Sequence, residues 1–219
     1  MKYLFLAIFI AASCFHLYYC HEYEHKKRLL TKPLLILSLL LFYVTASEEP
    51  SKVLVIALAC SWIGDILLMK KSDLWLVAGG AFFIAAHVML IIHFSGIPFA
   101  SGIPLLVIAL EAALLLYLSF RTIRRLGSKP GKILSGLLFM YLIINSVMNI
   151  FALNRLIAYP GPASALAVFG AINFFLSDCA LFLLIYCDDP PYVYRRNFTI
   201  MLTYLLAESM IVMSALIGQ

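Results

Sequence analysis

The sequence predicts an all-α fold, a polytopic membrane helical bundle with eight transmembrane helices, and two observations carry this prediction. Hydrophobic residues make up 64% of the 219 residues and charged residues only 12%, whereas soluble domains are about half apolar and a quarter charged. The apolar residues are also gathered into eight runs, most of them near the ~20 residues that cross a bilayer. These runs are residues 3–19, 32–46, 53–69, 74–94, 103–120, 133–152, 163–187 and 198–217.

The runs are expected to be helices, because backbone polar groups in lipid must pair within each span or within a closed barrel. Barrel strands would alternate in polarity over about ten residues, and Leu34–Phe42 is almost continuously apolar. The run 32–46 is short and is expected to begin at the membrane interface. Links between runs leave no room for a soluble domain, so residues 1–219 are expected to form a single transmembrane domain.

The basic residues predict the orientation of the chain in the membrane. Of the 16 Lys and Arg residues, only Lys2, Lys52 and Arg155 lie on the side of the chain ends. The other 13 follow the first, third, fifth and seventh runs: Lys26, Lys27, Arg28, Lys32, Lys70, Lys71, Arg121, Arg124, Arg125, Lys129, Lys132, Arg195 and Arg196. The positive-inside rule therefore predicts that both termini are extracytoplasmic. Anionic lipid attracts such short basic links, and a nucleic-acid partner is not expected.

Ionisable and polar side chains inside the runs are the candidate functional residues. A charged group within a span costs at least about 2.5–3.5 kcal/mol on insertion scales, so each needs a reason to be there. Their similar depths on different helices predict one shared polar cavity that opens toward the cytoplasmic leaflet. The candidates are Asp65, His87, Glu111, Tyr141, Asn145, Asn149, Asn173, Ser177, Asp178, Tyr204 and Glu208.

A structural role stays open for several of these residues. Asn145, Asn149 and Ser177 could join helices, as polar side chains do in membrane bundles. Glu111 could pair with a neighbouring donor that the sequence does not identify. His16 and His93 lie near the ends of runs, where snorkelling toward the interface is the expectation. For Asp65 and Asp178 the functional interpretation is the stronger one.

The segment His21–His25 matches the H-E-x-x-H pattern of zinc proteases, in which two histidines and a glutamate share a helix face. Three features argue against a zinc site here. Glu24 places a further charge inside the pattern, Lys26–Arg28 forms a basic flank that is expected to be a solvated loop, and no third ligand follows at a helical spacing. A membrane zinc protease using His21, Glu22 and His25 is therefore a minor alternative, and no metal or other cofactor is expected.

Several short motifs together resemble the YhhN-like lysoplasmalogenase family of eight-span membrane proteins. The similarity extends from about Thr31 to the C-terminus, and the motifs occur in the same order as in the family. They are Lys32-Pro33; Gly64-Asp65; Gly80, Phe83 and His87; Tyr141, Met148 and Ala152; Gly170-Ala171, Phe175 and Ser177-Asp178; and Thr203-Tyr204 with Ala207. Leu90 and Glu208 depart from the family, which often has an aromatic residue and an amide at these positions.

The resemblance implies hydrolysis of the vinyl ether of a lysoplasmalogen to a fatty aldehyde and a glycerophospho-base. Such cleavage needs an acid that protonates the β-carbon and an anion beside the resulting oxocarbenium ion, as in glycosidases. Asp65 and Asp178 would supply this pair without a metal, and the sequence does not say which one donates the proton. Supporting or substrate-binding roles fall to Lys32, His87, Tyr141, Asn145, Ser177, Tyr204 and Glu208.

Other interpretations of the same residues remain open. Lys32 could contact the phosphate of the lysophospholipid substrate or simply act as a positive-inside anchor. The polar cavity could instead serve a transporter or a lipid-binding membrane protein that performs no chemistry. Transporter folds often show broken spans in matching halves, and the sequence has no such paired arrangement. The headgroup preference, the chain-length preference and the oligomeric state do not follow from the sequence.

Overall fold

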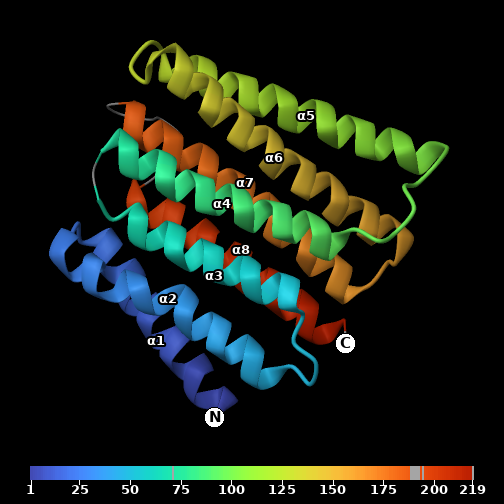
Figure 1. Ribbon diagram of the computed structural model, residues 1–219, viewed down its shortest axis with the longest axis horizontal. Helices are drawn as coiled ribbons and strands as arrows, with labels where there is room; N and C mark the ends of the chain where they lie inside the picture. The colour runs from blue at the N-terminus through green and yellow to red at the C-terminus, as the bar shows by residue number, and fades with distance from the viewer. Residues whose placement is uncertain (71, 188–192, 194, 219) are drawn as a thin grey trace. The chain divides into compact units, whose positions relative to one another are not determined.

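The computed structural model describes residues 1–70, 72–187, 193 and 195–218. These residues form eight α-helices and contain no strand, which confirms the all-α prediction (Figure 1). The helices are α1 (Lys2–His21), α2 (His25–Ala46), α3 (Lys52–Leu67), α4 (Asp73–Phe94), α5 (Ile103–Leu126), α6 (Gly131–Ala158), α7 (Pro162–Tyr186) and α8 (Asn197–Ile217). Lys71, one of the basic residues used above to predict orientation, lies outside the described residues.

Seven of the eight helices in the described part of the chain are long and apolar enough to cross a membrane. The chain is therefore an integral, multi-pass membrane protein. The exception is α3, which has 16 residues and so extends for about 24 Å at 1.5 Å per residue. The hydrocarbon core of a bilayer is about 30 Å thick, so α3 is shorter than the length that usually spans it.

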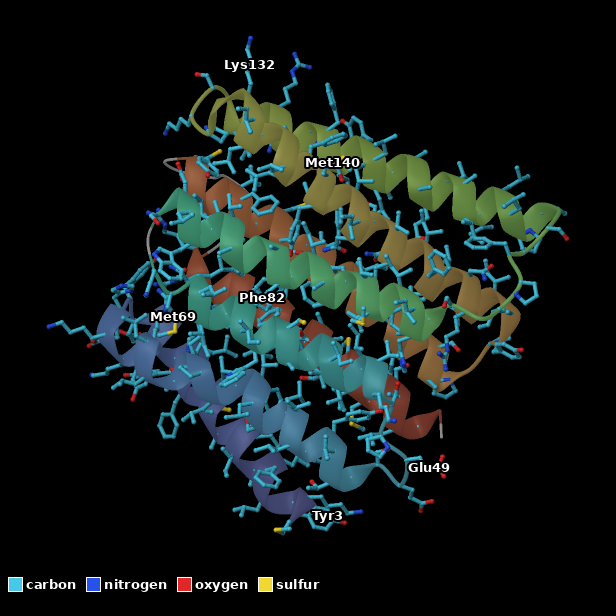
Figure 2. The ribbon with its side chains drawn as sticks, viewed as in Figure 1. Tyr3, Glu49, Met69, Phe82, Lys132 and Met140 are labelled. Carbon is cyan, nitrogen blue, oxygen red and sulfur yellow. The ribbon has the colours of Figure 1, made fainter. Side chains whose placement is uncertain are left out.

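Several helices extend beyond the runs that were predicted as membrane spans. Helix α2 begins at His25 rather than at residue 32, α5 continues to Leu126 rather than to 120, and α6 covers Gly131–Ala158. The basic residues were expected in links, but most of those near these boundaries lie in helical turns. Lys and Arg are good helix formers, and a helix can extend beyond the hydrocarbon core. Figure 2 shows the Lys132 side chain extending away from the start of α6.

By internal contacts the chain forms two compact units, Met1–His93 with Ala215–Gln219, and Phe94–Ser214. In the first unit α2 packs between α1 and α3 (Figure 1). Helices α3 and α4 approach closely, because a Cβ atom on Gly64 would lie 2.8 Å from the Phe83 ring and 3.2 Å from the carbonyl oxygen of Gly79. Glycine at position 64 therefore allows this approach beside Asp65.

In the second unit α6 packs against α5 and α7 (Figure 1). Helices α7 and α8 also approach closely, because a Cβ atom on Gly170 would lie 3.0 Å from the carbonyl oxygen of Ala207. Apolar side chains on the outer faces of the helices are exposed, as expected for surfaces that face lipid. Met140 of α6 is an example in this unit (Figure 2).

Candidate functional site

Asp178 is the centre of a buried polar cluster in the second unit. Its Oδ2 atom accepts a hydrogen bond from the Tyr141 hydroxyl at 2.9 Å and another from Asn145 Nδ2 at 2.7 Å. All three side chains are buried. Tyr141 and Asn145 lie four residues apart on α6 and therefore share a helix face, which directs both donors at the same oxygen on α7.

The polar stripe on α6 continues beyond this cluster. Asn149 Nδ2 donates to the backbone oxygen of Asn145 at 3.0 Å and to its Oδ1 atom at 3.1 Å. Asn149 thereby orients the Asn145 amide so that its Nδ2 atom faces Asp178. The Tyr141 ring packs edge-on against Phe182 of α7, with 5.3 Å between ring centroids. The two donors to Asp178 are thus held in place by their own neighbours.

Ser177, Tyr204 and Glu208 lie at the contact between α7 and α8. The Ser177 hydroxyl donates to the backbone oxygen of Ile200 at 3.0 Å, so its proton joins the two helices. Tyr204 packs edge-on against Phe174 at 5.5 Å between centroids, and Glu208 is also buried. Ser177 and Asp178 are neighbours in sequence, yet their hydrogen bonds reach different helices.

Asp65 lies in the first unit, in the last turn of α3, and forms an ion pair with Lys32 of α2. The distance from Lys32 Nζ to Asp65 Oδ1 is 3.1 Å, and the exposed fractions of the two side chains are 17% and 4%. A second bond lies one turn away, where Trp62 Nε1 donates to the Pro33 carbonyl oxygen at 2.9 Å. Lys32 and Pro33 at the start of α2 are therefore held by Asp65 and Trp62, which lie on one face of α3.

The sequence interpretation missed this ion pair, although a signal was present. Consecutive helices with a short link run antiparallel, so the first turns of α2 lie beside the last turns of α3. Tyr43 near the end of α2 marks the other end of this pairing, because its hydroxyl accepts a hydrogen bond from the backbone N–H of Ser51 at 3.0 Å. A lysine early in one span and an aspartate late in the next are placed to meet.

His87 is fully buried on α4 and lies one turn after Phe83, on the same helix face.

His16 was expected to snorkel from a span end, and this expectation is wrong. It is fully buried on α1, with Nδ1 at 2.7 Å from the Thr31 hydroxyl oxygen. Its neighbour is the start of α2, which the sequence interpretation had placed in a link. Glu111 is partly exposed on α5.

The H-E-x-x-H pattern does not form a helical site. His21 is the last residue of α1 and His25 is the first residue of α2. Tyr23 between them has a φ of 60°, which breaks the helical path. The two histidines therefore do not share one helix face, and the His21 ring contacts Glu22 instead, at 2.8 Å. Lys26–Arg28 belong to α2 rather than to a loop.

No group of three or more His, Cys, Asp or Glu side chains within the described ranges is arranged to hold a metal ion.

In a comparison with protein families, the sequence model of the YhhN family matches residues 27–215. The chain belongs to the YhhN family. The match includes both aspartates and every residue that contacts them in the clusters above. No curated protein and no solved structure matches the chain.

Proposed function

We propose that this YhhN-family protein is a membrane lysoplasmalogenase. It would hydrolyse the vinyl ether bond of lysoplasmenylethanolamine or lysoplasmenylcholine to a fatty aldehyde and a glycerophospho-base. Asp65 and Asp178 would be the two catalytic carboxyl groups, one donating the proton and the other stabilising the cation. The observation that carries the proposal is a buried carboxyl group, Asp178, that receives two hydrogen bonds from neutral donors. Family membership supports the class of reaction.

The reaction suits carboxylic acids that lie inside a membrane protein. Protonation of the β-carbon of a vinyl ether generates an oxocarbenium ion, which water then attacks. Burial disfavours the charged form of a carboxyl group, so a buried acid can keep its proton near neutral pH. The second catalytic carboxyl group would stabilise the cation as a carboxylate, the role that such a group has in glycosidases. No metal ion is needed for either step.

The remaining polar residues have supporting roles in this proposal. Tyr141 and Asn145 orient Asp178. The buried side chains of His87, Ser177, Tyr204 and Glu208 would shape the surroundings of the substrate and of the attacking water. The substrate is a lysophospholipid with one apolar chain, which reaches a membrane-embedded site from the lipid phase. A site that opens toward the cytoplasmic leaflet places the headgroup near the basic helix ends.

We also propose that α3 crosses the membrane, so that all eight helices do. If α3 crosses, the basic residues after α1, α3, α5 and α7 all lie on the cytoplasmic side, as the positive-inside rule requires. If α3 does not cross, the basic residues after α1 lie on the opposite side of the membrane from the basic residues after α5 and α7. We therefore expect reporters fused to either terminus to be active only outside the cytoplasm. Opposite locations for the two termini would show an odd number of crossings.

The direct test of the proposed function is the release of free aldehyde from lysoplasmalogen by the purified protein in detergent or vesicles. We expect stoichiometric aldehyde and glycerophospho-base, and no reaction with an acyl lysophospholipid of the same headgroup. Binding or movement of labelled lysolipid between leaflets with no aldehyde would instead identify a transporter or lipid-binding protein.

Aldehyde release is expected to survive chelators. The single variants His21→Ala, Glu22→Ala and His25→Ala are expected to keep turnover within about threefold of wild type, because surface substitutions away from packed features change little. Zinc content of the purified protein, measured before and after chelation, provides the control. Stoichiometric zinc that is lost together with activity would contradict this prediction and favour the protease alternative.

A further inference from the structure

We infer that Arg28 binds the phosphate group of a membrane phospholipid, at a site that the end of α1 and the start of α2 form within the first unit. The site goes beyond the proposed function, because its ligand is a lipid of the bilayer rather than the substrate. It also separates the role of Arg28 from that of Lys32, whose ammonium group is paired with Asp65.

The site lies at a membrane surface. Helices α1 and α2 are both long and apolar enough to cross a membrane, so the turn between them, residues 22–24, emerges from the bilayer. Tyr18 and Tyr19 in the last turn of α1 support this depth, because tyrosine is enriched where membrane and water meet. Lys27 Nζ lies 5.6 Å from the centroid of the Tyr19 ring. Arg28, in the first turn of α2, is therefore at the level of the lipid headgroups.

The charge of Arg28 has no carboxylate partner among the described residues, whereas two neighbouring cations do have one. Lys27 pairs with Glu24 at 3.4 Å. Lys32 pairs with Asp65 at 3.1 Å. The Arg28 side chain is half-buried, and its Nε atom is buried without a hydrogen-bond partner. Charged groups that are withdrawn from water are normally paired, so the partly exposed guanidinium group is suited to bind an external anion.

Contacts with α1 hold Arg28 in place. Its side chain donates a hydrogen bond to the sulfur of Cys20, which is buried one turn after the buried His16. The Thr31 hydroxyl donates to the backbone oxygen of Arg28 at 3.2 Å and lies 2.7 Å from His16 Nδ1. The other ring nitrogen, His16 Nε2, is buried without a partner, as Arg28 Nε is. Buried polar atoms usually have partners, so two such atoms together favour a ligand site over a closed structural contact.

The start of α2 adds a second attraction for an anion. The first N–H groups of a helix lack partners within the helix, and the helix dipole is positive at this end. Glu24 precedes α2 without forming a side-chain cap, and the first turn contains no acidic residue. Lys26, Lys27 and Arg28 instead add positive charge there, which is unfavourable unless an anion lies close by. A phosphate group offsets this charge and can accept two parallel hydrogen bonds from an arginine.

A phospholipid is the source of phosphate that this position favours. Basic pockets between transmembrane helices bind lipid headgroups through their phosphate groups, and the bilayer presents phosphodiesters at the depth of Arg28. Exposed apolar side chains continue along both helices toward the bilayer, among them Phe15 on α1 and Leu34 on α2. The acyl chains of a bound lipid can therefore lie against the two helices that hold its headgroup.

The experiment measures binding of dioctanoyl phosphatidylglycerol to the purified protein in a nonionic detergent, by native mass spectrometry and by thermal unfolding. Arg28→Met is expected to bind the lipid at least about tenfold more weakly than wild type, because hydrogen bonds between charged groups are stronger than neutral ones. Arg28→Lys is expected to lie between the two, since it keeps the charge and loses the planar fork.

Lys26→Met is the matched control, because Lys26 is exposed in the same helical turn and its loss changes the net charge equally. It is expected to bind the lipid as wild type does. Equal weakening in Arg28→Met and Lys26→Met would show diffuse attraction to a basic surface and would overturn the inference. If Arg28→Met does not fold, Arg28→Lys decides, and an affinity equal to that of wild type would overturn the inference as well.

Two further ligands identify the source of the phosphate. Dioctanoyl glycerol has the same chains without the phosphate, and inorganic phosphate has no chains. Neither is expected to raise the unfolding temperature of the wild type as phosphatidylglycerol does. An equal rise with either one would contradict the assignment to a phospholipid. These measurements need no lysoplasmalogen, so absence of aldehyde release would reject the proposed function and leave this test unchanged.

Discussion

Asp65→Asn and Asp178→Asn are each expected to lower aldehyde release by at least ~10²–10⁴-fold, the range for loss of a general acid or base. Asparagine keeps the size of the side chain and removes both the acid and the negative charge. The measurement is initial-rate aldehyde release by each purified variant at saturating lysoplasmalogen. Glu111→Gln is the matched control, because Glu111 is also a carboxyl group within a span, and its turnover is expected to stay near wild type.

The double variant Asp65→Asn/Asp178→Asn is expected to be little slower than the slower single variant. Residues that act on the same transition state as a unit are strongly non-additive, because losing either one already removes most of the stabilisation. Multiplicative losses in the double variant would show that the two aspartates act independently. Near-full turnover in either single variant would remove that aspartate from the mechanism.

The two substitutions are expected to differ in their effect on folding. Asp178→Asn keeps an oxygen that can accept from both Tyr141 and Asn145, so its unfolding temperature should remain close to that of wild type. Asp65→Asn leaves the ammonium of Lys32 without its carboxylate partner, although the pair is largely buried. Breaking such a pair typically costs about 3–5 kcal/mol, so this variant should unfold at a clearly lower temperature.

The helical fold could be predicted because a membrane span needs only length and apolarity, and both are visible in the sequence. Helix ends could not be predicted as well. The start of α2 contains Lys26 and Lys27. Lysine is a good helix former but is strongly polar, so a prediction from hydropathy alone places these residues in a link. The expectation that His16 snorkels was wrong for the same reason, because the turn of α2 that covers it was not recognised as helix.

The candidate site could be predicted one helix at a time. The spacing of Tyr141, Asn145 and Asn149 correctly indicates a polar face on α6, because the period of a helix is local. The partner of that face, Asp178, depends on how α6 and α7 pack, and no local pattern encodes this register. Lys32 and Asp65 are a similar case, since their pairing depends on the antiparallel register of α2 and α3.

Asn145→Ala is expected to have the second-largest effect, acting on both turnover and stability. Asn145 Nδ2 donates to Asp178 Oδ2 at 2.7 Å, and Asn145 Oδ1 accepts from Asn149. Alanine removes one donor from a buried carboxyl group and leaves the amide of Asn149 with a lost partner. Leaving buried polar groups unsatisfied costs about 1–3 kcal/mol. The Asp178 carboxyl group also loses one of the two donors that orient it, so both turnover and the unfolding temperature should fall.

Tyr141→Phe and Asn173→Ala distinguish the catalytic part of this effect from general loss of polar contacts. Tyr141→Phe removes only the hydroxyl that reaches Asp178 and keeps the ring against Phe182, so it should lower turnover with a smaller loss of stability. Asn173 bonds the Phe169 carbonyl oxygen of its own helix at 2.8 Å, and its replacement should spare turnover. Aldehyde release and thermal unfolding measured together decide the case. If Asn145→Ala unfolds earlier but turns over at the wild-type rate, its amide only joins α6 to α7, and Asp178 does not depend on it for chemistry.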